Sequence, residues 1–534
     1  MGSTGDRRRR AALVAAAGLV PAAFLAVFFV LPVGTIVGMG FHPGALVDVA
    51  GSARLRGIAW FTLWQAVVST VLTFVVALPA AAIVARYEFP GRRLLRAAVT
   101  IPFVLPSVVV ASAFEALGLS HGLVAILAAH VFFESAIVVR IVGGFWSNLD
   151  PRQEEAARLL GAGRLRAFLE VTLPRLAPAL LSAAALVFLF TFSSFGIVLI
   201  LGAPHYATLE VEIYRQTAQL LDLRVAAALT IVQMAAVLAL LLVQRALSDR
   251  VSGEQRLRAG TDVARRPRTV RERAGVATVA GATALVLGGP LAVLVVRSFS
   301  PGGGVGLGYY RALSTSRRGS ILFVPPWEAV ANSLGFAVVA TVVALAVGVP
   351  AAAVIARRRG GATRLFDSLL MLPLGTSAVT IGFGFLVALD ERPLDLRGSP
   401  WLIPLAHALV AAPFVVRVLV PVLRSVDERL REAAATLGAS PWRAWREIDL
   451  PIAARGALVA AGFAFAVSLG EFGATVFVAR PDYPTLPVAI FRFLGQPGDL
   501  NAGQAAALST ILMAVTVGAV LAIDRFRAGE LGEF

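Results

Sequence analysis

Long apolar runs, each bounded by short polar or basic segments, dominate the pattern of the chain. Several runs reach the roughly 20 residues that a helix needs to cross a bilayer. Apolar positions at every second residue, which would indicate the strands of a membrane barrel, are absent. The pattern therefore predicts an all-α polytopic membrane protein with about 12 transmembrane helices.

Polar and helix-breaking residues divide the predicted spans into two sets of six. The first set covers 13–38, 60–85, 97–117, 122–143, 178–202 and 224–245. The second set covers 276–297, 330–356, 367–389, 402–424, 456–479 and 502–523. We therefore expect a first repeat at 1–246, an arginine-rich linker at 247–273 and a second repeat at 274–534.

The two sets form an internal repeat. Leu78–Arg86 reads LPAAAIVAR and Val349–Arg357 reads VPAAAVIAR, so Pro350 is 271 residues beyond Pro79. The offset is 277 from His130 and His407 onward, which indicates one short insertion in the second half. Since six is an even number, both repeats enter the membrane from the same side. This predicts parallel repeats, related by a pseudo-two-fold axis along the membrane normal, with a solute path between them.

The positions of the basic residues indicate the orientation of the chain in the membrane. The formal net charge is +16, and the basic residues cluster in short segments between apolar runs, as the positive-inside rule requires. This placement predicts cytoplasmic termini, and it argues against nucleic acid as a partner. The apolar stretch from Ala11 to about Gly38 is too long for a signal peptide, so we expect a retained first helix.

The chain contains no lysine, so all 48 basic residues are arginine. A standard P-loop needs a lysine that reaches the β- and γ-phosphates of ATP, so such a site is excluded here. If ATP drives the process, another subunit hydrolyses it. The chain also lacks cysteine, which excludes thiolate ligands and thiol nucleophiles. We expect no catalytic residue, no metal site and no cofactor in this chain.

The longest inside loop of each half carries the same motif at the same spacing. It consists of Glu-Ala-Ala, then a glycine, then Leu-Pro at the start of the next span. The motif residues are Glu155, Ala156, Ala157, Gly161 and Pro174 in the first half, and Glu432, Ala433, Ala434, Gly438 and Pro451 in the second. Two copies at identical spacing indicate a shared role.

Each motif predicts a helix-turn-helix elbow. Asp150 and Asp427 stand where an N-cap would be, shortly before a run of helix formers. Gly161 and Gly438 would end the short helix, because glycine adopts a left-handed C′ conformation at little cost. The small alanines would let a partner's surface approach closely, and leucines beside them would supply an apolar face.

The motif resembles the signature loop of permeases of binding-protein-dependent ABC importers. Most such permeases carry one copy, whereas two copies in a chain of this length resemble the fused permeases of iron(III) and thiamine importers, along nearly the whole chain. The resemblance implies that each loop forms a coupling helix in a groove of an ATPase subunit, with one ATPase per half and an external solute-binding protein. It also implies a location in the plasma membrane of a prokaryote. The alternative is an Ala-rich amphipathic helix that lies on the membrane surface.

Three residues inside predicted spans are candidates for the solute path. Glu471 lies in the eleventh span, and Ser194 is its equivalent in the first half. Glu134 lies in the fourth span and shares a helical face with His130. An ionisable group at membrane depth lines a cavity or finds a partner inside the bundle, so Glu471 has both interpretations. Packing is the preferred interpretation for Glu134, because Ala411 stands at its equivalent position.

The resulting hypothesis is a permease subunit of an ABC-type importer, which forms the solute path and is coupled to ATPase subunits through the two loops. The segment from Ser193 to Pro204 looks closer to the thiamine type than to the iron(III) type. A secondary transporter driven by an ion gradient is the alternative, and it would need ion ligands at broken helices in both halves. A membrane-embedded transferase or hydrolase would need a nucleophile and a base close together, and no such set is found.

Overall fold

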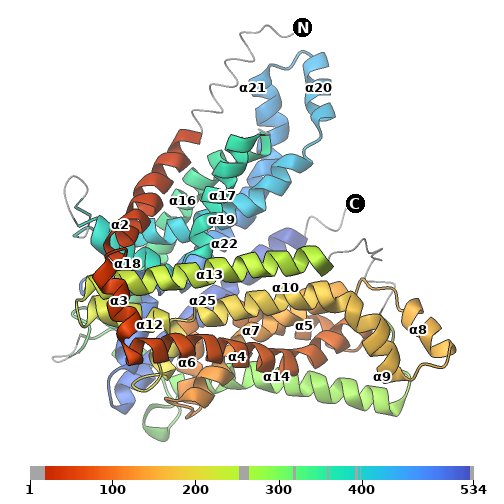
Figure 1. The fold of residues 1–534 in the computed structure, drawn as a ribbon, viewed down its shortest axis with the longest axis horizontal. Helices are drawn as coiled ribbons and strands as arrows, with labels where there is room; N and C mark the ends of the chain where they lie inside the picture. The colour runs from red at the N-terminus through yellow and green to blue at the C-terminus, as the bar shows by residue number, and fades with distance from the viewer. Residues whose placement is uncertain are drawn as a thin grey trace. The chain divides into compact units, whose positions relative to one another are not determined.

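The computed structural model describes residues 18–251, 264–316, 320–357, 360–390, 395–396 and 398–528. In these ranges the regular structure is helical, and an isolated bridge between Tyr87 and Arg265 is the only β pairing (Figure 1). Ten of the described helices are long and apolar enough to cross a membrane, or up to twelve if each of two bent helix pairs is one span. The predicted all-α membrane fold is therefore confirmed.

The candidate spans follow the two predicted sets. Those of the first repeat are Gly18–Gly40, which includes η1 (Ala26–Val30) and α2 (Leu31–Gly40), then α4 (Ala53–Arg86), α5 (Arg92–Val104) with α6 (Ser107–Ala116), α7 (Leu123–Trp146), α10 (Leu173–Phe192) and α13 (Leu223–Val251). Those of the second are α14 (Val270–Ser298), α16 (Pro326–Arg357), α17 (Gly361–Gly375) with α18 (Ala378–Ala388), α19 (Leu402–Ser425), α22 (Leu450–Gly470) and α25 (Asp499–Ala528).

Shorter helices connect the spans. In the first repeat they are α3 (Pro43–Gly51), α8 (Arg152–Leu159), α9 (Arg164–Ala167), η2 (Phe168–Thr172), α11 (Gly196–Leu201) and α12 (Leu209–Ala218). In the second they are η4 (Pro301–Gly303), α15 (Gly308–Ala312), α20 (Glu428–Thr436), α21 (Pro441–Ala444), η5 (Trp445–Asp449), α23 (Thr475–Val478) and α24 (Leu486–Leu494). Several therefore recur at equivalent places in both repeats.

The third predicted span of each repeat is bent rather than continuous. The angle between α5 and α6 is 105°, and that between α17 and α18 is 99°. Leu105, which precedes Pro106, has an extended backbone with ψ 139°, because proline disfavours helical geometry in the residue before it. In the second repeat the Ser377 hydroxyl accepts the N–H groups of Val379 and Thr380 and so starts α18 as a new helix.

The helices group into two compact units that do not coincide with the sequence repeats. One unit contains the chain up to His42, Gln216–Ala227 and Gly308 onward; the other contains Pro43–Arg215 and Ala228–Leu307. In the first unit α2 packs against α18, and Phe29 shares a core with Phe385. In the second unit α14 packs against α4, α5 and α6. Each repeat therefore contributes its first span to the unit formed mainly by the other.

Small residues allow close helix packing within each unit. In one, α16, α19 and α22 meet at a cluster rich in alanine: Ala344, Ala352, Ala408, Ala411, Ala460 and Ala464. In the other, a Cβ added to Gly143 of α7 would lie 3.4 Å from the carbonyl oxygen of Ala81 in α4. Dispersion contacts between backbones at this distance hold helices together without a gain from excluding water.

Candidate functional site

The first elbow follows α7 and is built around α8. The Asp150 carboxylate accepts the backbone N–H of Arg152 at 3.1 Å, which satisfies one of the free donors at the start of the helix. At its end, Gly161 has φ +93°, and Ala162 donates to the Ala157 carbonyl at 3.0 Å. These bonds form a Schellman-type C-cap, so Gly161 ends the helix as predicted, whereas the residue directly before α8 is Pro151 and not the predicted Asp150.

The second elbow repeats this geometry around α20. The Asp427 carboxylate accepts the Arg429 N–H at 3.0 Å. Gly438 has φ +79°, and Ala439 donates to the Ala434 carbonyl at 2.9 Å. The two elbows thus share the length of the turn, the left-handed glycine and an aspartate that accepts the N–H two residues on, although α20 begins one aligned position earlier than α8. In Figure 1, α8 lies beyond the end of α10, and α20 lies beyond the ends of α19 and α22.

The elbows carry large apolar side chains that the described chain leaves exposed. Leu159 and Leu160 are each 89% exposed, and Leu437, the equivalent of Leu160, is 88% exposed. Glu155 and Glu432 of the motifs are also exposed. An exposed apolar tip bordered by charged residues is typical of a surface that binds another protein. The leucines at the tips of the elbows therefore lie outside the packed core of the described chain.

Glu154 anchors the first elbow to the end of α4. Its carboxylate forms an ion pair with Arg86, and it accepts the Thr172 hydroxyl at 2.9 Å. The Arg86 guanidinium also lies over the Trp146 ring, 5.3 Å from its centre. Burial alone would raise the pKa of Glu154, but the hydrogen bond and charge of Arg86 outweigh it, so the pKa is lowered.

The second elbow uses a different anchor. Arg357, the equivalent of Arg86, lies 3.7 Å from the carboxylate of Asp449, which stands where the first repeat has Thr172. At the position of Glu154 the second repeat has Arg431. The acidic partner has therefore moved from the elbow helix to the π-helical turn before the next span. Sequence reasoning missed this anchor, although the exchange of charges between aligned positions was a signal for it.

A polar cavity of about 280 Å³ lies behind the first elbow. Its lining includes charged groups of both signs from the elbow, from α4, from the start of α10 and from the segment before α14: Arg86, Asp150, Glu154, Glu155, Arg158, Arg175 and Arg265. The elbow thus borders a polar cavity of its own unit, which the end of α4 and the segment before α14 also line.

Ser194 and Glu471 lie at equivalent breaks between helices. Ser194 stands between α10 and α11, and its carbonyl accepts the Thr208 hydroxyl at 2.9 Å. Glu471 stands between α22 and α23, and its carboxylate accepts the Ala474 N–H at 2.9 Å while its carbonyl accepts the Thr475 hydroxyl. At each break a side chain therefore satisfies a backbone group that a broken helix leaves free: Thr208 bonds the Ser194 carbonyl, and Glu471 bonds the Ala474 N–H. Such breaks at membrane depth occur where backbone is enclosed by protein or lines a cavity.

A histidine holds each break against neighbouring helices. The His130 ring bonds the hydroxyl of Ser69 in α4 at 3.1 Å and that of Ser194 at 2.8 Å. The His407 ring bonds the hydroxyls of Ser468 at 2.8 Å and Thr475 at 2.7 Å. Both rings are almost fully buried. The repeat thus preserves the histidine and its role as a bridge while exchanging the hydroxyls that it bridges.

Glu134 is buried without a hydrogen-bond partner for its Oε2 atom. Thr73 of α4 lies one turn beyond Ser69, as Glu134 lies one turn beyond His130, and its buried hydroxyl also lacks a partner. The equivalent positions in the second repeat are Ala344 and Ala411, both in the alanine-rich cluster. The structure therefore places Glu134 in a helix junction that the same fold also builds from alanines. No group of three or more His, Asp or Glu among the described residues lies close enough to hold one metal ion.

Comparison with known proteins agrees with this architecture. Residues 77–253 and 344–525 match the model of the family described as binding-protein-dependent transport system inner membrane component. A thiamine transport system permease protein from Brucella abortus is 29% identical over 520 residues, which cover 93% of this chain and 92% of that protein. The protein of that name from Escherichia coli is 26% identical over 470 residues, 84% of this chain and 85% of its own. A protein named as a probable ABC transporter permease, from Sinorhizobium fredii, is 26% identical over 529 residues, 92% and 91% of the two chains.

The two matched segments correspond to the two repeats, and together they cover more than half of the chain. The chain therefore belongs to the family of binding-protein-dependent transport system inner membrane components. It is a multi-pass membrane permease of the ABC importer class, in the fused form that carries two copies of the domain.

Proposed function

We propose that this chain forms the solute path of an ABC importer and that its two elbows couple this path to ATP hydrolysis by the ATPase subunits. The observation that carries the proposal is the pair of elbows, in each of which a short helix ends at a left-handed glycine beside an exposed leucine. Each elbow would rest on one ATPase subunit. Closure of the ATPase pair would move the elbows and switch the spans between inward-open and outward-open arrangements.

The positive-inside pattern supports a cytoplasmic position for both elbows and for both termini. The absence of lysine supports ATP hydrolysis on a separate subunit, because this chain has no P-loop lysine. An external solute-binding protein would deliver the solute to the opposite face, in keeping with the family to which the chain belongs. The proposed complex thus contains this permease, two ATPase subunits and a binding protein.

For the solute we propose thiamine, with iron(III) as the weaker candidate. The proposal rests on relatives named as thiamine transport system permease proteins that cover nearly the whole chain. Ser194 and Glu471 are the candidates for the path, because they stand at equivalent helix breaks where side-chain and backbone oxygens gather. Uptake of labelled thiamine by proteoliposomes that contain the complete complex tests this. Uptake of iron(III) and not of thiamine would contradict it.

Substitution of the elbow glycines tests the docking role. Gly161→Val and Gly438→Val force a β-branched residue into the left-handed region, which costs about 1–2 kcal/mol, although a Cβ added at either position meets no atom within 4 Å. We expect each variant to fold but to lose much of its co-purification with the ATPase. Gly161→Asn and Gly438→Asn, which tolerate this conformation better, serve as matched controls.

The outcome is read from ATPase retained per permease and from ATP-dependent uptake. If both valine variants assemble and transport like the unchanged protein, the elbows are not the docking sites. Uptake driven by a sodium or proton gradient in vesicles without any ATPase would instead support a secondary transporter.

A further inference from the structure

The last residues of the linker between the repeats are bound to the first repeat by backbone hydrogen bonds. The Arg265 N–H donates to the Arg86 carbonyl at 3.0 Å, and the Glu88 N–H donates to the Arg265 carbonyl at 2.9 Å. Arg265 therefore pairs on both sides of Tyr87, in a parallel bridge at the end of α4. Its guanidinium lies over the Tyr87 ring, 5.1 Å from the centre. This part of the linker is thus fixed to the loop after α4.

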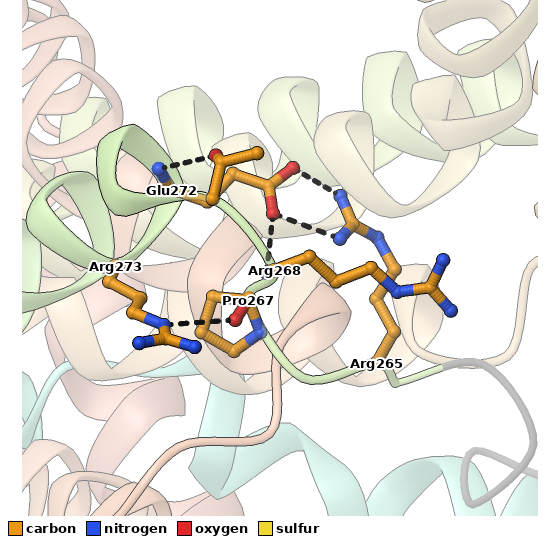
Figure 2. A network of polar contacts seen from close by, with 6 residues as sticks. Arg265, Pro267, Arg268, Glu272 and Arg273 are labelled. Carbon is orange, nitrogen blue, oxygen red and sulfur yellow. Dashed lines mark hydrogen bonds and ion pairs between the residues drawn. The ribbon is translucent and has the colours of Figure 1, made fainter.

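A second set of bonds fixes Arg265 to the start of α14. The Glu272 carboxylate accepts two bonds from the Arg265 guanidinium, at 2.7 and 3.1 Å (Figure 2). The same carboxylate accepts the Arg268 N–H at 2.9 Å, and the Thr269 hydroxyl accepts the Glu272 N–H at 3.2 Å. This is a capping box extended by a bidentate arginine, so the position of Arg265 and the beginning of α14 are set together.

Residues 86–88 then connect the linker to the first elbow. The backbone of Arg86 receives the linker, and its side chain pairs with Glu154 of α8. Arg265 and Glu154 both line the polar cavity behind the elbow. One continuous series of contacts therefore runs from α14 through Arg265 and Arg86 to the elbow helix. All of these residues belong to the same compact unit.

We propose that the linker segment 264–272 is a positioning clamp for the first elbow, with Arg265 as its central residue and Arg86 as the residue that transmits its effect to α8. The proposal goes beyond the docking role proposed above and rests on it only for the consequence in transport. It makes the two elbows unequal, since the second is anchored instead by Arg357 and Asp449 at 3.7 Å.

The absence of cysteine from the sequence allows a direct test on the full chain. A single cysteine at Leu160 or at its equivalent Leu437 carries a nitroxide spin label, and the labelled permease is studied alone in lipid nanodiscs. Arg265→Ala is compared with Arg265→Lys and with Arg266→Ala, which removes the same charge from an exposed neighbour. Arg265→Lys keeps the charge but loses the bidentate geometry.

We expect Arg265→Ala to shorten the rotational correlation time of the label at position 160 by roughly two-fold, because the elbow loses one side of its support. The label at 437 should not change, Arg265→Lys should fall between, and Arg266→Ala should leave both labels as they were. An unchanged label at 160, equal changes at both positions, or the same effect from Arg266→Ala would each overturn the proposal. Since no ATPase is present, this result does not depend on the docking role.

The second measurement uses the unlabelled permease in complex with its ATPase. We expect Arg265→Ala to lower the solute transported per ATP hydrolysed by roughly two- to five-fold while the complex still assembles. If even the unchanged permease binds no ATPase, the proposed function fails while the label result stands. If the label at 160 responds but the transport ratio does not, the clamp has no role in coupling and the proposal is overturned on that point.

Discussion

At the residue scale, comparison of the two repeats shows which side chains the fold requires. His130 and His407 make the same kind of bridge between hydroxyls, so that bridge serves both halves. Glu134 and Thr73 have no such counterpart, because Ala411 and Ala344 stand in their places. A buried carboxyl without a partner opposes folding, and the second repeat shows that the junction forms without it. Although the sequence alone favours packing, we therefore propose a role in transport for Glu134.

The double variant Thr73→Ala, Glu134→Ala tests this explanation. The lost volume is destabilising, but two unsatisfied polar groups, each costing roughly 1–3 kcal/mol, disappear with it. We expect the thermal unfolding midpoint in detergent to stay nearly unchanged and solute uptake to fall at least several-fold. Phe132→Ala, at a fully buried residue of the same helix, is the control for an ordinary core truncation and should cost about 3–5 kcal/mol. Uptake that equals that of the unchanged protein would assign Glu134 no role in the path.

A second residue-scale prediction concerns the ion pair of Glu154. Arg86 and Thr172 hold the pKa of this carboxyl below its usual value, against the effect of burial. The pair therefore contributes stability above the ordinary pKa of about 4.3, and the contribution is lost as the pH falls through the lower folded value. The label at position 160 should become more mobile below about pH 4. Glu154→Gln should remove this acid transition, and its persistence in that variant would assign it to another group.

At the element scale, helix breaks distinguish the structure from its hydropathy pattern. The bend between α5 and α6 lies at Pro106, and the bend between α17 and α18 lies at Ser377, the equivalent position. Proline disfavours helical geometry in the residue before it, whereas serine starts a new helix by accepting its first N–H groups. The two repeats thus reach nearly the same angle, 105° and 99°, through different chemistry.

This difference gives an element-scale prediction. Ser377→Ala should lower the free energy of unfolding by about 1 kcal/mol, because the first N–H groups of α18 lose their acceptor. Pro106→Ser should be nearly neutral, because it installs the residue that already caps the equivalent helix. Thermal unfolding of the purified variants measures both effects. If Pro106→Ser is the more destabilising of the two, proline and not the cap is what the first bend requires.

The same elements show what sequence could and could not predict. The spans, the repeat and the elbow caps follow from local patterns: apolar length, spacing, and an Asp before and a Gly after a short helix. The bends at Pro106 and Ser377 were missed because a hydropathy run does not record a change of direction. The anchors Arg86–Glu154 and Arg357–Asp449 join residues 68 and 92 positions apart and differ between the repeats, so no single pattern indicated them. The clamp at Arg265 likewise depends on a backbone pairing that side-chain pattern does not encode.

At the scale of the whole molecule, the first span of each repeat belongs to the compact unit of the other. The unit that contains α16, α19 and α22 also contains α2, and the unit that contains α4, α7 and α10 also contains α14. Fusion into one chain guarantees that the two repeats are made in equal amounts. It also joins each unit to the span that the other repeat supplies to it. Each half needs a helix from the other to complete its own core, so neither half should be a stable folding unit alone.

Division of the chain between residues 251 and 264 tests this interdependence. We expect the two fragments to co-purify in detergent and to restore ATP-dependent uptake when they are expressed together, because each unit then recovers its missing span. Expressed alone, each fragment should aggregate or be degraded, since α14 or α2 would be absent from a buried interface. Removal of the residues up to His42 from the first fragment should weaken its co-purification with the second fragment. The two fragments without this deletion should co-purify fully. Monodisperse, protease-resistant fragments that form separately would show that the exchanged spans are not required, and that each repeat completes its core by itself.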